Sequence, residues 1–416
     1  MRHVLDLHIH SRYSRACSPQ LDLEHIDAAC RTKGVDIIAS GDFTYPAWAE
    51  AMRRELEETA SGSGLYRLKA REDDKVRFII GTEVSLVYKD NVKTRRIHLV
   101  VHAPDLEAAA ELSRQLDKKY NIRSDGRPIL GASAPDFVKL TLSVDPRFLV
   151  YPAHIWTPWY SVFGSKSGFD SLEECFQDQV ENIYAYETGL SSDPEMNWRL
   201  SALDQLTLLS SSDAHSLANI AREANVMKIS GEPTYQKIYD NIRGHRGMIE
   251  TIEFYPEEGM YHLDGHRDCS FRCLPEESRR QGGICPVCHK PLVIGVLNRV
   301  EELSDRLEGL RPAGASGFRK TVELDKIIAE VMGIKSRASR AVQEEHRRLI
   351  SRYGTELSIL LDLDIDQAAE MDFRIREGIR RVREGKLSIA PGFDGQYGEI
   401  KIFAAGTEPS WQKSLL

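Results

Sequence analysis

Metal-binding residue types recur where short apolar runs end, throughout the first 220 residues of the chain. His8 and His10 follow the first such run, Asp42 follows the second, and Glu83 follows the third. Apolar runs of this length that alternate with amphipathic stretches predict buried strands alternating with helices. We therefore expect an α/β fold with parallel strands, arranged either as a barrel or as an open sheet.

The carboxyl ends of parallel strands meet at one mouth of such a fold, so side chains at successive strand ends converge there. In a strand, His8 and His10 point to the same side, and both imidazoles can reach one cation. Taken alone, a His-x-His motif is equally consistent with two surface histidines at a strand end. The recurrence of ligand types favours a metal site. The candidate ligands are His8, His10, Asp42, Glu83, His98, His154, Asp213 and His215.

A mixed set of imidazoles and carboxylates indicates which metals and which chemistry to expect. Such ligands suit zinc, manganese or iron better than a magnesium site built only of oxygen. Clustered divalent cations activate water at neutral pH and stabilise the leaving oxygen of a phosphoester. Glu83 is suited to bridge two of them. We expect two or three divalent ions (zinc, manganese, iron or magnesium) and a metal-dependent phosphoesterase.

The ordered ligand set resembles the polymerase-and-histidinol-phosphatase (PHP) superfamily over residues 1–225. That resemblance implies a distorted seven-stranded α/β barrel that binds up to three divalent metals. Two segments depart from the pattern. Residues 11–15 lack the carboxylate often found after His-x-His, and residues 41–45 lack a histidine that many relatives carry. One metal position is therefore expected to be weak or differently liganded.

A narrower resemblance, to the endonuclease Q family, runs over nearly the full length. It rests on residues 152–159, 163–171, 187–193, 212–215, 262–267, 283–288 and 391–395. It implies a DNA-repair nuclease that cleaves 5′ to deaminated bases (uracil, hypoxanthine, xanthine) and to abasic sites. By this resemblance Asp193 is catalytic, and Glu187 is a further metal ligand or a partner of one. The alternative for Asp193 is a helix N-cap before Pro194.

Selecting a damaged base in a duplex requires taking that base out of the stack. A pocket for it needs aromatic walls and a few converging polar groups. Ser171 either contributes to this recognition or caps a helix. The candidate substrate-binding residues are the aromatic Trp156, Trp159 and Phe163, the loop residues Gly164, Ser165, Lys166 and Gly168, and Ser171.

Four cysteines within twenty residues predict a structural zinc in a small module. Cys285 and Cys288 form a Cys-x2-Cys knuckle, and Cys269 and Cys273 form a less regular pair. His266 competes with Cys273 for the fourth ligand position. We expect this zinc to hold the module together and to take no part in the chemistry.

The last third of the chain is helical in composition and carries two basic runs. A basic run is often only a solvated helix face, but two runs in a chain of net charge −8 favour contact with the DNA backbone. The terminal peptide resembles the motif by which bacterial repair proteins bind the sliding clamp. A plain disordered terminus is the alternative. The residues of that peptide that would bind the clamp are Gln412, Ser414, Leu415 and Leu416.

These observations divide the chain into three parts. We expect a PHP-type barrel over 1–225, a connecting region with the zinc module over 226–310, and a helical, basic DNA-binding domain with a short β-like tail over 311–416. No apolar stretch is long enough to span a bilayer, so we expect a cytoplasmic, nucleoid-associated protein with damaged DNA as its partner. The alternatives are a PHP-type phosphatase for a small phosphomonoester and a DNA-binding scaffold with a degenerate metal site.

Overall fold

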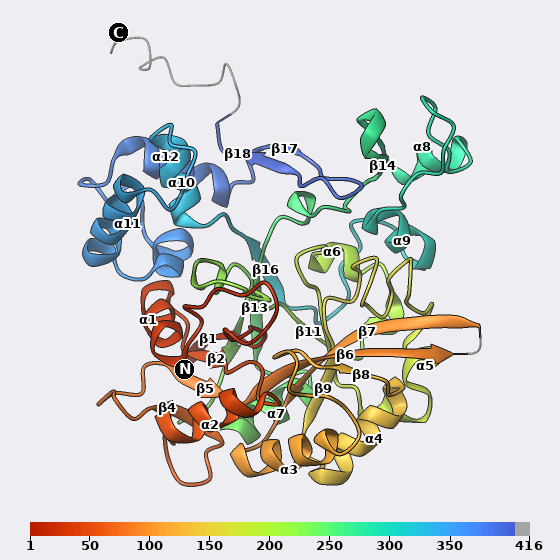
Figure 1. Ribbon diagram of the computed structural model, residues 1–416. Coiled ribbons are helices and arrows are strands. Elements are labelled where there is room, and N and C mark those ends of the chain that lie inside the picture. Colours follow the sequence, from red (N-terminus) through yellow and green to blue (C-terminus); the bar gives the residue numbers. More distant parts are fainter. Residues whose placement is uncertain (91, 404–416) are drawn as a thin grey trace.

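The computed structural model describes residues 1–90 and 92–403 and has a mixed α/β fold (Figure 1). Its largest sheet has eight strands, in the spatial order β16 (Gly317–Lys320), β13 (Met248–Glu253), β12 (Ala224–Lys228), β1 (Arg2–Asp6), β2 (Ile37–Ala39), β5 (Arg77–Ile79), β4 (Leu65–Leu68) and β3 (Leu56–Glu58). A second sheet contains β8 (Ile129–Leu130), β6 (Gly81–Asp90), β7 (Lys93–His102) and β9 (Leu149–Pro152). A pair of parallel strands, β10 (Ala185–Glu187) and β11 (Thr207–Leu209), lies next to β9.

The strands are not parallel throughout, which differs from the expectation. β1, β2 and β5 run parallel, whereas β12 is antiparallel to both β1 and β13. β6 and β7 form a long antiparallel hairpin, because no helix-length segment separates them and a parallel pair needs a crossover. The hydrogen-bonded ladders stay in separate sheets, so closure of a seven-stranded barrel stays a prediction.

Helices cover the sheets and pack on one large apolar core. The helices of this part of the chain are α1 (Leu23–Lys33), α2 (Pro46–Glu55), α3 (Leu106–Asp117), α4 (Ala134–Val144), α5 (Leu172–Phe176), α6 (Pro194–Asn197) and α7 (Tyr235–Arg243). Among the described residues, no helix combines the length and the apolar character that crossing a membrane requires.

Two lobes lie beside each other above this body (Figure 1). One has its own apolar core and contains α10 (Leu324–Val331), α11 (Arg340–Tyr353), α12 (Phe373–Arg383) and the strand pair β17 (Ser388–Ala390) and β18 (Glu399–Lys401). The other has a small core around Cys273, Cys285 and Leu292. It contains β14 (Asp264–His266), β15 (Phe271–Cys273), α8 (Pro275–Arg280) and, at its base, α9 (Val296–Leu303).

The sequence assigned β16 to the helical part, yet this strand pairs in parallel with β13 at the edge of the eight-stranded sheet. β12 and β13 likewise extend that sheet beyond residue 225. The last third of the chain therefore contributes a strand to the body that carries the candidate metal site.

Candidate metal centre

Glu83, at the start of β6, lies between two groups of imidazoles. Its Oε2 is 3.2 Å from Nε2 of His10 and 3.6 Å from Nε2 of His8. Its Oε1 is 2.6 Å from Nδ1 of His98 and 3.1 Å from Nε2 of His154. Each carboxylate oxygen thus faces a different pair of rings, which is the arrangement by which one carboxylate bridges two cations.

The first pair of rings follows β1 and is oriented from behind by carboxylates. Nδ1 of His8 is 3.0 Å from Oε2 of Glu187, and Nδ1 of His10 is 3.1 Å from Oδ1 of Asp42. A carboxylate at Nδ1 fixes the proton there and leaves Nε2 as a lone-pair donor. Both Nε2 atoms therefore point at the space beside Glu83 as potential metal ligands.

Asp213, in the loop after β11, completes the first group. Its Oδ1 lies 3.1 Å from Nε2 of His10 and 3.8 Å from Nε2 of His8. The loop is held by Asp6, the last residue of β1, whose buried carboxylate accepts the backbone N–H groups of Ser212 and Ala221. Burial raises the pKa of Asp6 to about 6.

Three of the predicted ligands adopt the left-handed backbone conformation, which non-glycine residues rarely take. The φ angles are 49° at Asp42, 30° at His154 and 46° at Asp213. Each of these residues directly follows or closely follows a strand. Strained backbone of this kind clusters at functional sites, where the surrounding structure stabilises it.

Unpaired buried atoms show, without reference to any family, that the candidate ligands suit divalent cations. Nε2 of His8, Nε2 of His10 and Oδ1 of Asp213 are buried and have no hydrogen-bond partner among the described residues. Buried polar atoms are rarely left unpaired, since each costs about 1–3 kcal/mol. The ligand atoms of His8, His10, Glu83 and Asp213 lie within 4.8 Å of one another, and so do those of Glu83, His98 and His154.

In the second group, the ionisation states of His98 and Glu83 suit metal ligands, whereas nearby carboxylates, Glu83 first, raise the pKa of His154 against the effect of burial. Nδ1 of His98 and Nε2 of His154 lie 3.3 Å apart, both directed at Glu83. Burial lowers the pKa of His98 to about 4, so that ring is neutral at pH 7. Burial also opposes ionisation of Glu83, but His98 and Arg127 outweigh it and hold the pKa of Glu83 well below its ordinary value.

Asp42 and His215, although predicted as ligands, belong to neither group among the described residues. The oxygens of Asp42 are already used. Oδ1 faces His10, and Oδ2 accepts from the backbone N–H and hydroxyl of Ser11 and from the hydroxyl of Ser14. The ring of His215 packs beside that of His10, with centroids 4.6 Å apart. Metal contact by Asp42 and His215 stays a prediction.

Arg127 was not anticipated from the sequence. Its Nη1 donates to Oε2 of Glu83 at 2.8 Å, at the edge of the first group. It lies in a loop that passes so close to Asp42 that a side chain at Gly126 would meet Oδ2 of that residue at 2.4 Å. No spacing or periodicity marks an arginine in such a loop. The preceding residue, Gly126, donates its N–H to the carbonyl oxygen of Tyr13 at 3.0 Å, so this loop lies beside residues 11–15.

Asp193 is the N-cap of α6, at the end of a loop that passes beside His154. The loop starts at Gly189, which has φ 64° and lies so close to His154 that a Cβ would meet the Cβ of that residue at 2.3 Å. Oδ1 of Asp193 accepts the N–H of Met196 at 2.9 Å, so the capping role is present. The catalytic role of Asp193 stays a prediction, and so does metal contact by Glu187.

The predicted substrate-binding residues divide into packed and accessible ones. Trp156 and Phe163 are both 1% exposed, and their ring centroids lie 4.9 Å apart in the core. Trp159 is partly exposed and packs edge-on against Tyr261, and Lys166 is exposed. Ser171 caps α5 by accepting the N–H of Glu174.

The loop from 164 to 168 is tightly folded. A side chain at Gly164 would meet the carbonyl oxygen of Thr157 at 2.6 Å, and one at Gly168 would meet the carbonyl oxygen of Val162 at 2.4 Å. The hydroxyl of Ser165 is buried and has no partner among the described residues. Both glycines are thus required by packing, and base recognition by this loop stays a prediction.

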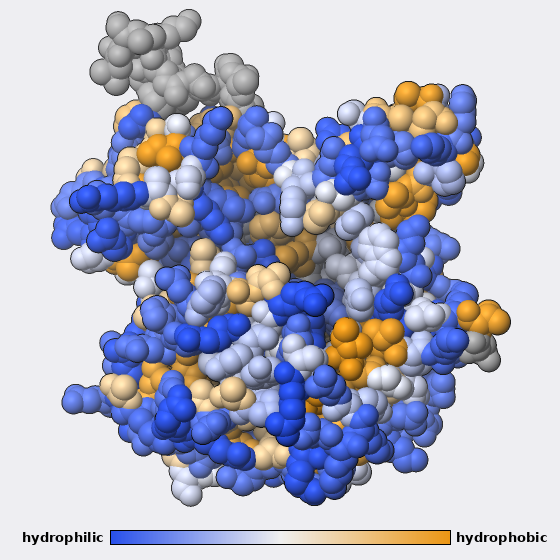
Figure 2. Space-filling view, viewed as in Figure 1, coloured by the Kyte–Doolittle hydropathy of each residue, from blue (hydrophilic) through white to orange (hydrophobic). Residues whose placement is uncertain are grey.

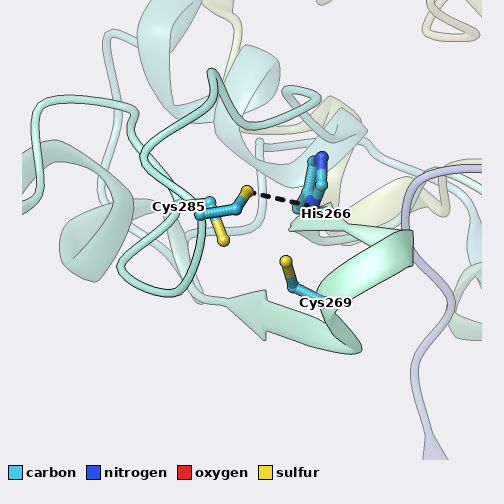
Figure 3. A group of neighbouring side chains, drawn as sticks. His266, Cys269 and Cys285 are labelled. Carbon is cyan, nitrogen blue, oxygen red and sulfur yellow. Dashed lines mark hydrogen bonds between the residues drawn. The ribbon is translucent and has the colours of Figure 1, made fainter.

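A second group of metal-ligand types lies in the β14–α8 lobe. His266, Cys269, Cys285 and Cys288 bring their ligand atoms within 4.8 Å of one another. Figure 3 shows the labelled His266, Cys269 and Cys285 pointing toward one another. Cys273 is not part of this group among the described residues, and its buried side chain contributes to the small core of the lobe. Among the described residues, His266 lies with the three cysteines and Cys273 does not, and zinc binding by this group stays a prediction.

The two basic runs are largely paired with acidic residues of the same lobe. Arg340 lies 2.6 Å from Glu344, and Arg352 lies 2.5 Å from Glu370. Arg348, Arg374, Arg380, Arg381 and Lys386 also form ion pairs.

Figure 2 shows a notch between this lobe and the β14–α8 lobe. The predicted clamp-binding residues Gln412 to Leu416 lie outside the described residues.

Comparison with solved structures gives two full-length matches. A crystal structure of a lesion-specific endonuclease Q from Pyrococcus furiosus superimposes with a TM-score of 0.85 and 28% identity, covering 100% of this chain and 98% of that one. A complex of endonuclease Q with a 27-mer duplex that carries an abasic lesion at the active site gives a TM-score of 0.85 and 29% identity over 100% of both chains. The chain resembles endonuclease Q over its whole length.

Two proteins without an assigned function are similar in sequence to this chain. The protein YqxK of Bacillus subtilis is 28% identical over 414 residues, which is 95% of this chain and 98% of YqxK. The protein MJ0043 of Methanocaldococcus jannaschii is 33% identical over 254 residues, but the match spans only 31% of that protein. Residues 323–386 match the family model of the MJ0043 C-terminal domain. These residues include α10, α11 and α12. The helical lobe therefore matches both the MJ0043 C-terminal domain and the corresponding part of endonuclease Q.

Proposed function

We propose that the chain is a metal-dependent DNA repair endonuclease that hydrolyses the phosphodiester 5′ to deaminated bases and to abasic sites. The observation that carries this proposal is the position of Glu83 between two groups of imidazoles, with three buried ligand atoms left unpaired beside it. The likeness to endonuclease Q, at 28–29% identity over the whole chain, supplies the substrate class.

In this proposal His8, His10, Glu83 and Asp213 would hold one cation, and Glu83, His98 and His154 would hold another. Divalent cations held there would supply positive charge and Lewis acidity for phosphodiester hydrolysis. Glu187 keeps the proton of His8 on Nδ1, and Asp42 does the same for His10. Asp193 accepts a hydrogen bond from the attacking water and orients it toward the phosphorus.

Around this centre we assign the remaining parts by their chemistry. A structural zinc bound by His266, Cys269, Cys285 and Cys288 stabilises the β14–α8 lobe, whose apolar core is too small to fold alone. The extruded base is received by accessible groups near Trp159 and the 164–168 loop, on which an unstacked base can pack. Damaged duplex DNA is the proposed partner.

The test is a set of end-labelled duplexes of one sequence that carry a single uracil, hypoxanthine, xanthine or abasic site, with the undamaged duplex as the control. We expect one cut on the 5′ side of the lesion in the presence of manganese or magnesium. Asp193→Asn is expected to remove cutting while an asparagine still caps α6, and its melting temperature is measured alongside because Lys320 loses its partner carboxylate. Release of phosphate from small phosphomonoesters without any cut at a lesion would overturn the proposal in favour of a phosphatase. Binding of the duplexes without turnover would favour the scaffold.

A further inference from the structure

Lys320 on β16 forms an ion pair with Asp193, although the two residues lie in different thirds of the chain. Nζ of Lys320 is 2.7 Å from Oδ2 of Asp193. The other oxygen, Oδ1, accepts the N–H of Met196 at 2.9 Å. The carboxylate is therefore held at both oxygens, by a backbone amide on one side and by a cation on the other.

The direction of the Lys320 side chain follows from the alternation along β16. Phe318 and Lys320 point to one face of the strand, where Phe318 packs edge-on against Trp198 and Lys320 meets Asp193. Arg319 points to the opposite face and pairs with Glu250 at 2.5 Å. A slip by one residue in the pairing of β16 with β13 would remove the lysine from Asp193 altogether.

The surroundings hold Lys320 in this place. Its ammonium lies 5.5 Å from the ring centroid of Tyr255, and its side chain is 20% exposed. Asp193 is 4% exposed, so a free carboxylate at this position would be desolvated without compensation. An unanchored Asp193 would relieve that cost by rotating toward water and away from the geometry of its helix cap.

We propose that Lys320 is a positioning residue for Asp193, supplied to the active site by the strand that leads into the helical lobe. This inference rests on the proposed function, because it assigns Lys320 a role only through a catalytic Asp193. The pairing of β16 with β13 would then affect catalysis. The residue that orients Asp193 lies outside residues 1–220, which contain the candidate metal ligands.

The test is the single-turnover rate of cutting at an abasic site, measured together with the dissociation constant for the uncut duplex. Lys320→Met is expected to slow cutting on the order of 100-fold, the size of effect that misplacing a catalytic group produces. The dissociation constant is expected to stay at its wild-type value, and Lys320→Arg is expected to restore most of the rate. Lys320→Met should not lower the rate below that of Asp193→Asn, because Lys320 acts only through Asp193.

Arg319→Met is the matched control, since it removes a cation from the same strand but from the opposite face. It is expected to cut at the wild-type rate. If Lys320→Met folds poorly, Lys320→Gln, which keeps a hydrogen-bond donor on a side chain one atom shorter, takes its place. Wild-type rates in Lys320→Met, or weaker DNA binding with an unchanged rate, would overturn the inference while leaving the proposed function intact. A wild-type protein that cuts no lesion would overturn both.

Discussion

The Nδ1 atom of His8 lies 3.0 Å from Oε2 of Glu187, and the same oxygen accepts the backbone N–H of His154. One carboxylate at the end of β10 therefore braces a histidine from each of the two ligand groups. Burial would lower the pKa of His8, but Glu187 and Glu83 outweigh it and raise that pKa well above its ordinary value. If a cation were bound at Nε2 of His8, Glu187 would keep the proton on Nδ1. This hydrogen bond would make the imidazole a stronger ligand.

Glu187→Ala is expected to weaken metal binding about 10-fold to 100-fold, because partners behind a ligand tune its affinity by that amount. Titration with manganese against a chelating indicator measures the change. Glu181→Ala is the matched control, since Glu181 is exposed and lies on the neighbouring 3-10 helix. Equal affinities in the two variants would show that Glu187 does not act through His8.

Asp42 and Asp213 are expected to respond differently to the same change. Asp213→Asn weakens a ligand whose Oδ1 is unpaired, so we expect loss of metal with little change in thermal stability. Asp42→Asn places an amide where Ser11 and Ser14 donate, so a destabilisation of about 1–3 kcal/mol is expected. Metal content by atomic emission and melting temperature, measured on both variants, separate the two roles. Loss of metal from Asp42→Asn at an unchanged melting temperature would instead make Asp42 a ligand.

The cysteines of the β14–α8 lobe give a similarly paired prediction. Cys285→Ser is expected to remove the bound zinc, whereas Cys273→Ser is expected to retain it. Cys273 is buried in the core of the lobe, so its substitution costs packing and not a ligand. Zinc per chain, measured after exhaustive dialysis, is expected to match the wild type for Cys273→Ser and to be lower by one for Cys285→Ser. The reverse result would place Cys273 in the site and His266 outside it.

A buried charge network joins the helical lobe to the body and predicts acid sensitivity. Oε1 of Glu356 lies 3.0 Å from Nζ of Lys33 on α1, and Oε2 lies 2.9 Å from Nε2 of His346 on α11. Burial opposes ionisation, but Lys33 and His346 outweigh it and lower the pKa of Glu356 from 4.5 to about 2. A lowered carboxyl pKa stabilises the fold above pH 4.5, and that contribution is lost as the pH falls from 4.5 toward 2.

Glu356→Gln leaves the Lys33 charge buried without its partner, so a loss of about 3–5 kcal/mol is expected at neutral pH. The protection of α11 against hydrogen–deuterium exchange, corrected for the intrinsic exchange rate at each pH, is expected to fall in this variant and to depend less on pH below 4.5 than in the wild type. Glu344→Gln is the control, since Glu344 pairs with Arg340 at the surface of the same helix, where such pairs contribute about 0–1 kcal/mol. Unchanged protection of α11 in Glu356→Gln would contradict the network.

The positions of the candidate ligands could be anticipated from the sequence because they depend on a local rule. His8 and Asp213 follow short buried strands, and strand ends converge whatever the details of the sheet. The mixed direction of the sheet could not be anticipated. The hydrophobic pattern of one strand does not tell which other strand pairs with it. β12 and β16 join the sheet from distant parts of the chain.

Side-chain contacts between residues far apart in the sequence could not be predicted either, because local patterns do not show which segments lie side by side. Arg127 reaches Glu83 from a loop, and Lys320 reaches Asp193 from an edge strand. Neither residue lies in a motif, and each acts through one long-range contact. Asp42 shows the complementary limit, because its residue type and position suit a ligand, yet its oxygens are occupied by His10 and two serines.

We propose that the two groups of candidate ligands on either side of Glu83 perform the cutting. The most direct measurement is the rate of cutting of an abasic-site duplex by the metal-stripped protein, before and after manganese is returned, for the wild type and Glu83→Ala. We expect no cutting by the stripped wild type, full recovery with manganese, and no recovery in Glu83→Ala at any manganese concentration. Cutting that survives metal removal, or that persists in a folded Glu83→Ala protein, would contradict the account.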